Sequence, residues 1–269
     1  MKKYRGFLKY FMLVSPVFAC LGIIVALARA DRTAPRLRGQ ELKAPSAEEE
    51  GPEFTFVRAV YSGLGPWGYY KSWATDWPKA DRQFILGIKR LTNIKVADQE
   101  KTIDLTKPEL FRFPFIYAVE VGHMDLTEEE ASSLREYLQR GGFMFCDDFW
   151  GSQEWENFQR NMAKVLPGSK VVDIPRDHAI FHCYYDIQQI LQVPNVGNAL
   201  YQNITHEQDG FVPFCRGIFD DNGRLMVVIN WNTDIGDAWE WADLPGYPAK
   251  YSTYAYQMGI NAIVYAMSH

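Results

Sequence analysis

Short apolar runs alternate with helical stripes along most of the chain after residue 53. The runs 54–61 and 114–119 are rich in aromatic and β-branched residues, and the second has the continuous apolar character of a strand covered on both faces. Between them, apolar residues spaced by four, four and three positions after Pro78 indicate one face of a helix. This region therefore predicts a strand, a helix and a second strand.

The next helix is marked at both ends. Thr127 and Glu130 form the pattern of a capping box, and a Gly-Gly pair at 141–142 follows the last apolar position of the stripe. A buried strand is predicted over 143–146 and another amphipathic helix over 155–165. Because a strand, helix, strand unit places its strands in parallel, the pattern predicts an α/β fold with a mostly parallel sheet and helices on both faces.

The last third predicts a hairpin and a buried helix. Segments 214–219 and 224–231 flank Asn222-Gly223, a pair that is typical of tight β-hairpins. Residues 250–269 are apolar on nearly all sides, but the continuous apolar part is too short for a membrane span. We therefore expect a C-terminal helix that packs into the domain.

The first 30 residues carry an export or membrane signal. Positions 11–28 hold no charged residue, four basic residues precede them, and Ala28-Arg29-Ala30 matches a small-x-small cleavage site. Since this run lies between the lengths of a cleaved signal and a spanning helix, we expect a signal peptide or a membrane anchor over 1–30, with membrane contact through 11–28. Residues 31–52 predict a flexible tether, which leaves a single α/β domain over 53–269 at the cell envelope.

Charge narrows the range of partners. The chain of 269 residues is 47% hydrophobic, which is enough for a sizeable core. Its net charge is −5, and because the first 30 residues contribute five basic residues and no acid, the remainder carries −5 minus +5, or −10. Nucleic acids and anionic lipid surfaces attract clustered basic residues, so we expect the domain to bind a neutral glycan or an envelope protein, and no nucleic acid.

Polar residues follow the predicted buried strands. Glu120 and His123 come after the second strand, and Asp147, Asp148 and Trp150 come after the third. Ligands of open α/β sheets bind outside the carboxyl ends of the strands, which makes these residues a candidate ligand site. The alternative is that an aspartate only caps the next helix and that the Trp only packs.

A second polar group closes the predicted hairpin. Asn232, Asp234, Asp237 and Trp239 are typical either of turn chemistry or of a polar site beside an aromatic wall. The resulting hypothesis is that five residues converge at one edge of the sheet: Glu120, Asp147, Asp148, Asn232 and Asp234.

Two histidines suggest a metal site less strongly. His178 and His182 are four residues apart, as two ligands on one helical face are. Pro175 and the β-rich run 180–185 predict a loop and a strand instead, in which the two imidazoles do not converge. We therefore expect structural roles for both, and we predict no metal and no cofactor.

Several motifs resemble a bacterial family. They are Trp73-x2-Asp76-Trp77-Pro78-x-Ala80-Asp81, Cys146-Asp147-Asp148-Phe149-Trp150-Gly151, Asp177-His178-Ala179-Ile180-Phe181-His182-Cys183 and Gly236-Asp237-Ala238-Trp239-Glu240. Together they resemble the family called domain of unknown function 4159 over nearly all of residues 53–269. That family is distantly similar to the trehalose-utilisation and class I glutamine amidotransferase-like superfamily, which implies a flavodoxin-like sheet.

The sequence departs from the amidotransferase pattern at the catalytic positions. Cys146 lacks the glycines of a Gly-x-Cys-x-Gly elbow, and the strand that would supply the histidine ends in Asn230-Trp231-Asn232. An amide does not take a proton from a thiol near neutral pH, so no intact Cys-His-Glu triad is recognisable.

Two classes of function follow from these patterns. We expect a non-catalytic binding or scaffold module at the cell envelope. The alternative is a carboxylate-dependent hydrolase that acts on a carbohydrate or cell-wall component, which needs two carboxyl groups about 5–5.5 Å or about 6.5–9.5 Å apart.

Overall fold

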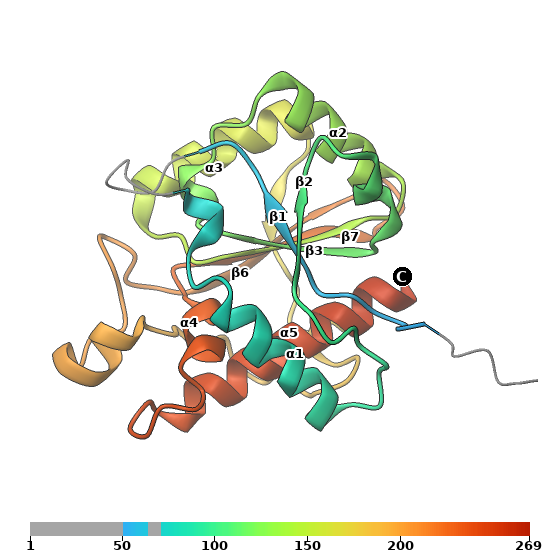
Figure 1. Cartoon of the computed structure of the whole chain (residues 1–269). Helices are drawn as coiled ribbons and strands as arrows, with labels where there is room; N and C mark the ends of the chain where they lie inside the picture. Colours follow the sequence, from blue (N-terminus) through green and yellow to red (C-terminus); the bar gives the residue numbers. More distant parts are fainter. Residues whose placement is uncertain (1–50, 64–70) are drawn as a thin grey trace, which may run out of the picture. The chain divides into compact units, whose positions relative to one another are not determined.

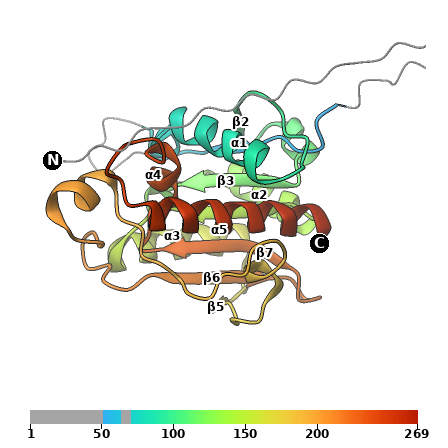
Figure 2. The ribbon, with the colours of Figure 1, turned by 90° about the horizontal axis from the view of Figure 1, so that it is seen from below.

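The apolar runs of the sequence form the central sheet of the protein, and helices cover both of its faces (Figures 1 and 2). The computed structural model describes residues 51–63 and 71–269. Within these residues seven strands form one sheet, in the order β2-β1-β3-β4-β7-β6-β5. Their bounds are β1 Val57–Val60, β2 Lys101–Asp104, β3 Phe115–Val119, β4 Phe143–Asp147, β5 Val171–Asp173, β6 Phe214–Phe219 and β7 Leu225–Trp231.

Five of these strands are parallel. In chain order, β1, β2, β3, β4 and β7 lie in the spatial order 2-1-3-4-5, which is the flavodoxin-like order. The hairpin partner β6 is antiparallel to β7, and β5 is antiparallel to β6. The predicted α/β class and the mostly parallel sheet are therefore confirmed.

The helices form two outer layers. On one face lie α1 (Lys79–Leu91), α4 (Ile235–Glu240) and α5 (Ala249–Ser268), and on the other α2 (Glu128–Gln139) and α3 (Gly151–Val165) (Figure 1). Short 3-10 turns are η1 Ser72–Ala74, η2 Pro108–Arg112, η3 Val121–His123 and η4 Ala179–Phe181, and η5 (Asn198–Gln202) is a π-helical turn.

Alternation along the buried strands divides the core between the two helical layers. In β3, Phe115 and Tyr117 contribute to the cluster on the α1 and α5 face, whereas Ile116 and Ala118 contribute to the cluster on the α2 and α3 face. Successive side chains of a strand point to opposite faces, so a continuous apolar run supplies both layers at once.

Most predicted elements are present. The helix after Pro78, the strand before Glu120 and the hairpin around Asn222-Gly223 are all found within about two residues of their predicted bounds. The helix α2 has the predicted capping box, and α5 packs into the core as expected.

The predicted strand at 180–185 is wrong. This segment is the turn η4 followed by loop, because Asn261 of α5 takes the place of a strand partner. Its side chain accepts a hydrogen bond from the Tyr185 amide at 2.7 Å and donates to the carbonyls of Ile180 and Tyr185, both at 2.9 Å. The sequence pattern also missed the short strands β2 and β5, neither of which is a continuous apolar run, and the helix α4.

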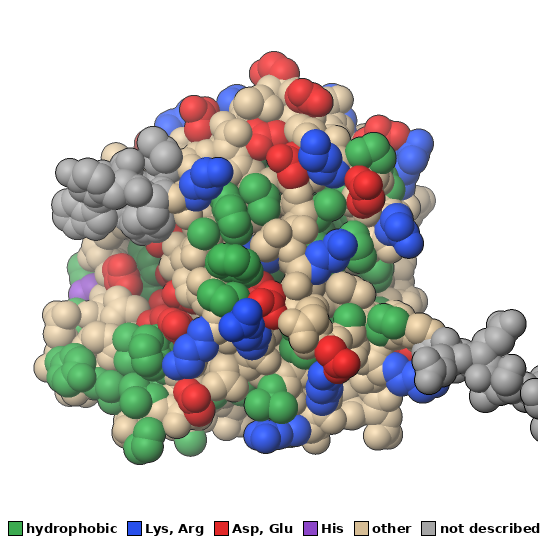
Figure 3. Space-filling view, in the orientation of Figure 1, with side chains coloured by type: hydrophobic (Ala, Val, Ile, Leu, Met, Phe, Trp, Pro, Cys, Tyr) green, Lys and Arg blue, Asp and Glu red, His purple; other side chains and the backbone are tan. Residues whose placement is uncertain are grey.

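The predicted signal or anchor at 1–30 and nearly all of the tether at 31–52 lie outside the described residues. Within the described ranges, no helix combines the length and the apolar character needed to cross a membrane. Acidic and basic side chains are interspersed over the described part of the face in Figure 3.

Candidate functional site

Five residues with left-handed backbone mark the carboxyl end of the parallel strands. Glu120 follows β3, Asp148 follows β4 and Asn232 follows β7, with φ of 55°, 51° and 61°. Asp76 and Gln208, in neighbouring loops, have φ of 61° and 47°. A non-glycine residue in this conformation costs about 1–3 kcal/mol, and such residues concentrate at functional sites. Five of the six in the described chain lie at this edge.

Three aspartates from three different loops converge here, and we call them the three-aspartate site. Asp76 lies between η1 and α1, Asp148 follows β4, and Asp234 precedes α4. Each offers a carboxylate oxygen, and these oxygens all lie within 4.8 Å of one another. The side chains of Asp148 and Asp234 are almost completely buried, whereas Asp76 is only partly buried and forms the outer member.

Two of the three aspartates use one oxygen to hold their own loop. Asp148 accepts a hydrogen bond from the indole Nε1 of Trp150 at 2.9 Å, and Asp234 caps α4 by accepting from the amide of Asp237 at 2.8 Å. Asp76 differs, because its Oδ2 is buried and has no hydrogen-bond partner. Among the described residues, none of the three forms an ion pair.

Burial gives these carboxyl groups an unusual acidity. The pKa of each of the three is raised well above its ordinary value, first by burial and then by neighbouring carboxylates. For Asp148 the main charged neighbour is Glu120, and for Asp234 it is Asp148. A buried carboxylate cluster needs protons or a cation to balance its charge, so the site is suited to a positively charged ligand.

A buried arginine holds the loop that carries Asp76. The guanidinium of Arg58 in β1 donates to Asp81 at 3.0 Å and to the carbonyls of Trp73 at 3.1 Å and Thr75 at 2.7 Å. Both Arg58 and Asp81 are fully buried. The arginine therefore ties β1, η1 and α1 together next to Asp76.

Asp147, which the sequence predicts as a site residue, has a structural role: it holds the start of α4. It is fully buried and accepts hydrogen bonds from the amides of Ile235 at 3.1 Å and Gly236 at 2.8 Å, and from the Tyr117 hydroxyl at 3.0 Å. Burial nevertheless raises its pKa to about 7. Its role in the structure is to fix the start of α4, and thereby the position of Asp234.

The other polar candidates also hold backbone. Asn232 accepts from the Gly151 amide at 2.9 Å and donates to the Val212 carbonyl at 2.7 Å, so it connects β7 to the start of α3. Asp237 accepts from the Val196 amide and from Trp241 Nε1, and it forms a second acidic group with Asp76 and Glu240.

The two tryptophans predicted at the site, Trp150 and Trp239, do not form an exposed aromatic surface beside it. Trp150 is 2% exposed, and Trp239 is fully buried in the core, where it stacks on Phe84 with ring centroids 4.0 Å apart. Their size is used for packing at the edge of the sheet and beneath it.

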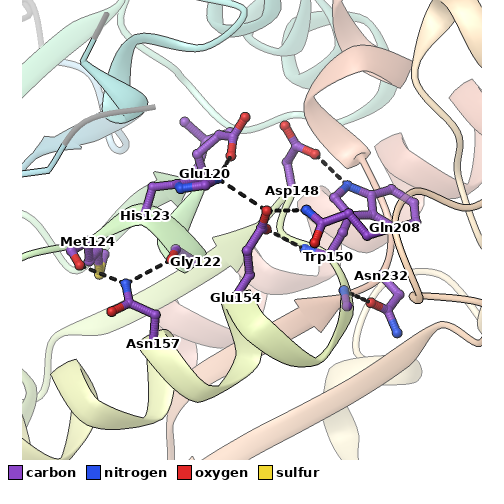
Figure 4. A network of polar contacts seen from close by, with 12 residues as sticks. Glu120, Gly122, His123, Met124, Asp148, Trp150, Glu154, Asn157, Gln208 and Asn232 are labelled. Atoms are coloured by element: carbon purple, nitrogen blue, oxygen red, sulfur yellow. Dashed lines mark hydrogen bonds and ion pairs between the residues drawn. The ribbon is translucent and has the colours of Figure 1, made fainter. Parts of the chain in front are cut away.

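Glu120 and His123 join a residue that the sequence did not single out, Glu154 in the first turn of α3. We call this group the Glu-His-Glu cluster. Figure 4 shows the three side chains pointing toward one another, with Asp148 alongside. Burial is the main cause that raises the pKa of Glu120 to about 8, and His123 opposes it.

His178 and His182 lie elsewhere and do not converge. His178 accepts a hydrogen bond from the Ile180 amide at 3.1 Å, and His182 pairs with Asp186 at 2.6 Å on an exposed part of the surface. The structural roles expected for both agree with these contacts.

Cys146 is fully buried among apolar side chains, and burial raises the pKa of its thiol well above the ordinary range. A thiol in this setting is inert as a nucleophile. Cys146, Cys183 and Cys215 are all free.

Sequence reasoning missed Asp76, Glu154 and Gln208 as site residues. Asp76 is part of the Trp-x2-Asp-Trp-Pro motif that carries the family resemblance, so a signal was present. No sequence signal pointed to Glu154, because acidic residues are common in the first turn of a helix. Gln208 donates to Glu154 from a loop 54 residues away, a contact that only the folded chain creates.

Comparison with known proteins agrees with the resemblance noted from the motifs. A family model described as "Domain of unknown function (DUF4159)" matches residues 55–267. No curated protein matches the chain.

Proposed function

The chain belongs to the family of domain of unknown function 4159, and we propose that it is a non-catalytic module that binds a hard divalent cation, Ca²⁺ or Mg²⁺. The cation occupies the three-aspartate site. In this proposal the loaded site, at the carboxyl end of the sheet, is where an envelope-held domain binds a neutral glycan or a protein partner.

The convergence of Asp76, Asp148 and Asp234 is the observation that carries this proposal. Three carboxylate oxygens within 4.8 Å of one another form an oxygen-only donor set of the kind that Ca²⁺ and Mg²⁺ prefer. Asp76 Oδ2 is buried without a hydrogen-bond partner, so one lone pair is already free for a ligand. Buried charges are normally paired or coordinate metals, and here no ion pair within the described residues supplies the balance.

The location of the three-aspartate site in the fold also supports a role in ligand binding. Ligands of flavodoxin-like sheets bind where the strand order reverses, which in this sheet is between β1 and β3. Asp76 follows β1 and Asp148 follows β4, beside β3. The distant relationship to the amidotransferase-like superfamily remains part of the proposal, and the parallel strand order supports it.

A hydrolase of carbohydrates is the less favoured function. Its mechanism needs a sugar oxygen between two carboxyl groups. Asp148 and Asp234 are 7% and 3% exposed, and such burial suits a small ion better than a sugar ring. The envelope location rests on the uncharged run 11–28 with its basic flank.

Thermal unfolding of the full-length chain tests the cation site. After chelator treatment at pH 7.5, Ca²⁺ or Mg²⁺ is expected to raise the melting temperature, because a ligand that binds only the folded state stabilises it by about 2.7 kcal/mol at 100 times Kd. Asp148→Asn and Asp234→Asn are expected to lose this increase. Both variants keep a carbonyl oxygen that accepts the hydrogen bond from Trp150 Nε1 or the Asp237 amide.

The matched control is Asp221→Asn, in the exposed turn between β6 and β7, which is expected to keep the full increase. A wild-type chain that neither ion stabilises, or an increase that persists in both site variants, would contradict the proposal.

A further inference from the structure

The Glu-His-Glu cluster contains a buried imidazole nitrogen that lies between two carboxylates and makes no hydrogen bond. His123 Nε2 has no hydrogen-bond partner, although it lies 3.4 Å from Glu120 Oε2 and 3.2 Å from Glu154 Oε1 (Figure 4). The three residues come from three elements: the end of β3, the turn η3 and the start of α3. The fold thus brings two carboxylates to one imidazole without completing a hydrogen bond between them.

These distances match the spacing of ligands around one metal ion. Ligand atoms that sit about 2.0–2.1 Å from a tetrahedral Zn²⁺ ion lie roughly 3.3 Å from one another. The two contacts of His123 Nε2 fall on either side of this value. A direct hydrogen bond from an N–H to a carboxylate would favour a shorter and better aligned contact.

Surrounding groups hold Glu154 in place. The Trp150 amide donates to its Oε2 at 2.6 Å, and the side chain of Gln208 donates to its Oε1. A side-chain oxygen has lone pairs for both a hydrogen bond and a metal, and such outer contacts commonly orient metal ligands.

Close approach of η3 to α3 depends on a glycine. A Cβ at Gly122 would come within 2.5 Å of Glu154 Cβ, so a larger residue would force His123 and Glu154 apart. Asn157, one turn further along α3, donates to the Gly122 carbonyl at 2.8 Å and fixes this approach.

A cavity adjoins the cluster. It has a volume of about 460 Å³, and His123 and Glu154 both line it. Its other lining residues are Gly122, Gln153, Asn157, Arg160 and Gln208. Three protein ligands with a space beside them are the arrangement of a zinc site that keeps one position open for water or a ligand.

We propose that Glu120, His123 and Glu154 bind a first-row transition metal ion such as Zn²⁺, with an open coordination position toward the cavity. This site goes beyond the proposed function, because its imidazole ligand favours Zn²⁺ or Co²⁺ whereas the oxygen-only three-aspartate site favours Ca²⁺ or Mg²⁺. The opposing arrangement is a protonated His123 held between two carboxylates with no metal.

Co²⁺ binding to the full-length chain, purified without a histidine tag and stripped with chelator, tests the site. The wild type is expected to bind one Co²⁺ with the intense visible absorption of a four-coordinate ion, and Zn²⁺ is expected to displace it. His123→Ala is expected to weaken Co²⁺ binding by more than about 100-fold, since the loss of a ligand exceeds the 10–100-fold cost of losing an outer contact. Gln208→Ala, which leaves all three ligands intact, is expected to cost about 10–100-fold.

His182→Ala is the matched control, because it removes a histidine that also contacts a carboxylate but lies on an exposed surface. This variant is expected to bind Co²⁺ as the wild type does. Melting curves without metal check that His123→Ala is folded. Absence of Co²⁺ and Zn²⁺ binding to the wild type, or four-coordinate Co²⁺ that survives His123→Ala, would overturn the site.

Ca²⁺ stabilisation of His123→Ala separates this proposal from the proposed function. The three-aspartate site keeps its ligands in that variant, so its Ca²⁺ response is expected to persist while the Co²⁺ spectrum is lost. The reverse result is expected for Asp234→Asn, which loses the Ca²⁺ response and keeps the Co²⁺ spectrum.

Discussion

Arg58 is a charged residue that the interior of this protein depends on. Its guanidinium is fully buried, contacts Asp81 in α1, and lies 4.8 Å from the ring centre of Tyr117. Its Nη1 donates to the backbone carbonyls of Trp73 in η1 and of Thr75 directly after η1. Because the guanidinium charge is paired and each of its three nitrogens has a hydrogen-bond partner, the buried pair holds the loop before Asp76 without leaving an unpaired ion.

Asp81→Asn is expected to destabilise the domain by about 3–5 kcal/mol, because it leaves the Arg58 charge buried without its counterion. Urea unfolding of the variant against the wild type measures this loss. The control is Asp98→Asn, which removes the exposed partner of Lys89 and is expected to change the unfolding midpoint little. A loss in Asp81→Asn no greater than in the control would show that Arg58 does not need its counterion.

Helix α2 shows how local chemistry specifies an element. The Thr127 hydroxyl accepts from the Glu130 amide at 3.2 Å, and the Glu130 carboxylate accepts from the Thr127 amide at 2.8 Å. The same carboxylate accepts from the Ser62 amide at 2.8 Å, so the cap also holds the loop after β1. A capping box that can be recognised from four consecutive residues therefore also positions the loop after β1, near the candidate site.

Thr127→Ala is expected to lower the free energy of unfolding by about 1 kcal/mol, since the first turn of α2 loses its side-chain acceptor. Thr127→Ser keeps the acceptor oxygen and is expected to stay close to the wild type. Chemical unfolding of the three proteins compares them. Equal losses in the Ala and Ser variants would assign the effect to the methyl group and not to the cap.

At the scale of the whole molecule, the carboxyl end of the sheet collects acidic side chains whose pKa values burial raises. Burial raises the pKa of Asp147 to about 7 and of Glu120 to about 8. In the unfolded chain both groups release their protons near pH 4. Between these values the folded state holds protons that the unfolded state has lost.

Stability of the chelator-treated domain is therefore expected to fall as the pH rises from 5 to 8, because stability decreases with pH wherever the folded state binds more protons. Acids with a lowered pKa, such as Asp104 and Asp220, are ionised in both states above pH 5 and do not contribute in this range. Urea midpoints at pH 5 and 8 measure the effect, and Glu120→Gln is expected to reduce it. A midpoint that is flat or rises with pH would contradict the expectation.

Much of the fold could be predicted from the sequence because its determinants are local. The continuous apolar run of β3, the capping box of α2 and the Asn-Gly turn between β6 and β7 each depend on a few neighbouring residues. The strand predicted over 180–185 was wrong for the opposite reason. Its backbone partner is the side chain of Asn261, about 80 residues away, which no local pattern encodes.

The candidate site divides in the same way. The hypothesis that acids gather at the carboxyl end of the sheet follows from parallel strands, and Asp148 and Asp234 are there. Burial and individual hydrogen bonds decide the role of each acid. They determine which carboxylates are free for a ligand and which accept hydrogen bonds from backbone amides. Asp147 and Asp148 are adjacent in the chain, yet they have different roles. Asp147 accepts hydrogen bonds from the first amides of α4, whereas Asp148 lies beside Asp76 and Asp234.

The sequence by itself determined the class of fold, the faces of the strands and the ends of the helices, since periodicity and capping act over a few residues. Only the tertiary structure decided that Asp76 completes the three-aspartate site and that Glu154, which accepts a hydrogen bond from Gln208, lies beside His123. The physical reason is that these groups come from loops far apart in sequence. Their distances are set by the packing of β1, β3, β4 and α3 and not by any pattern along the chain.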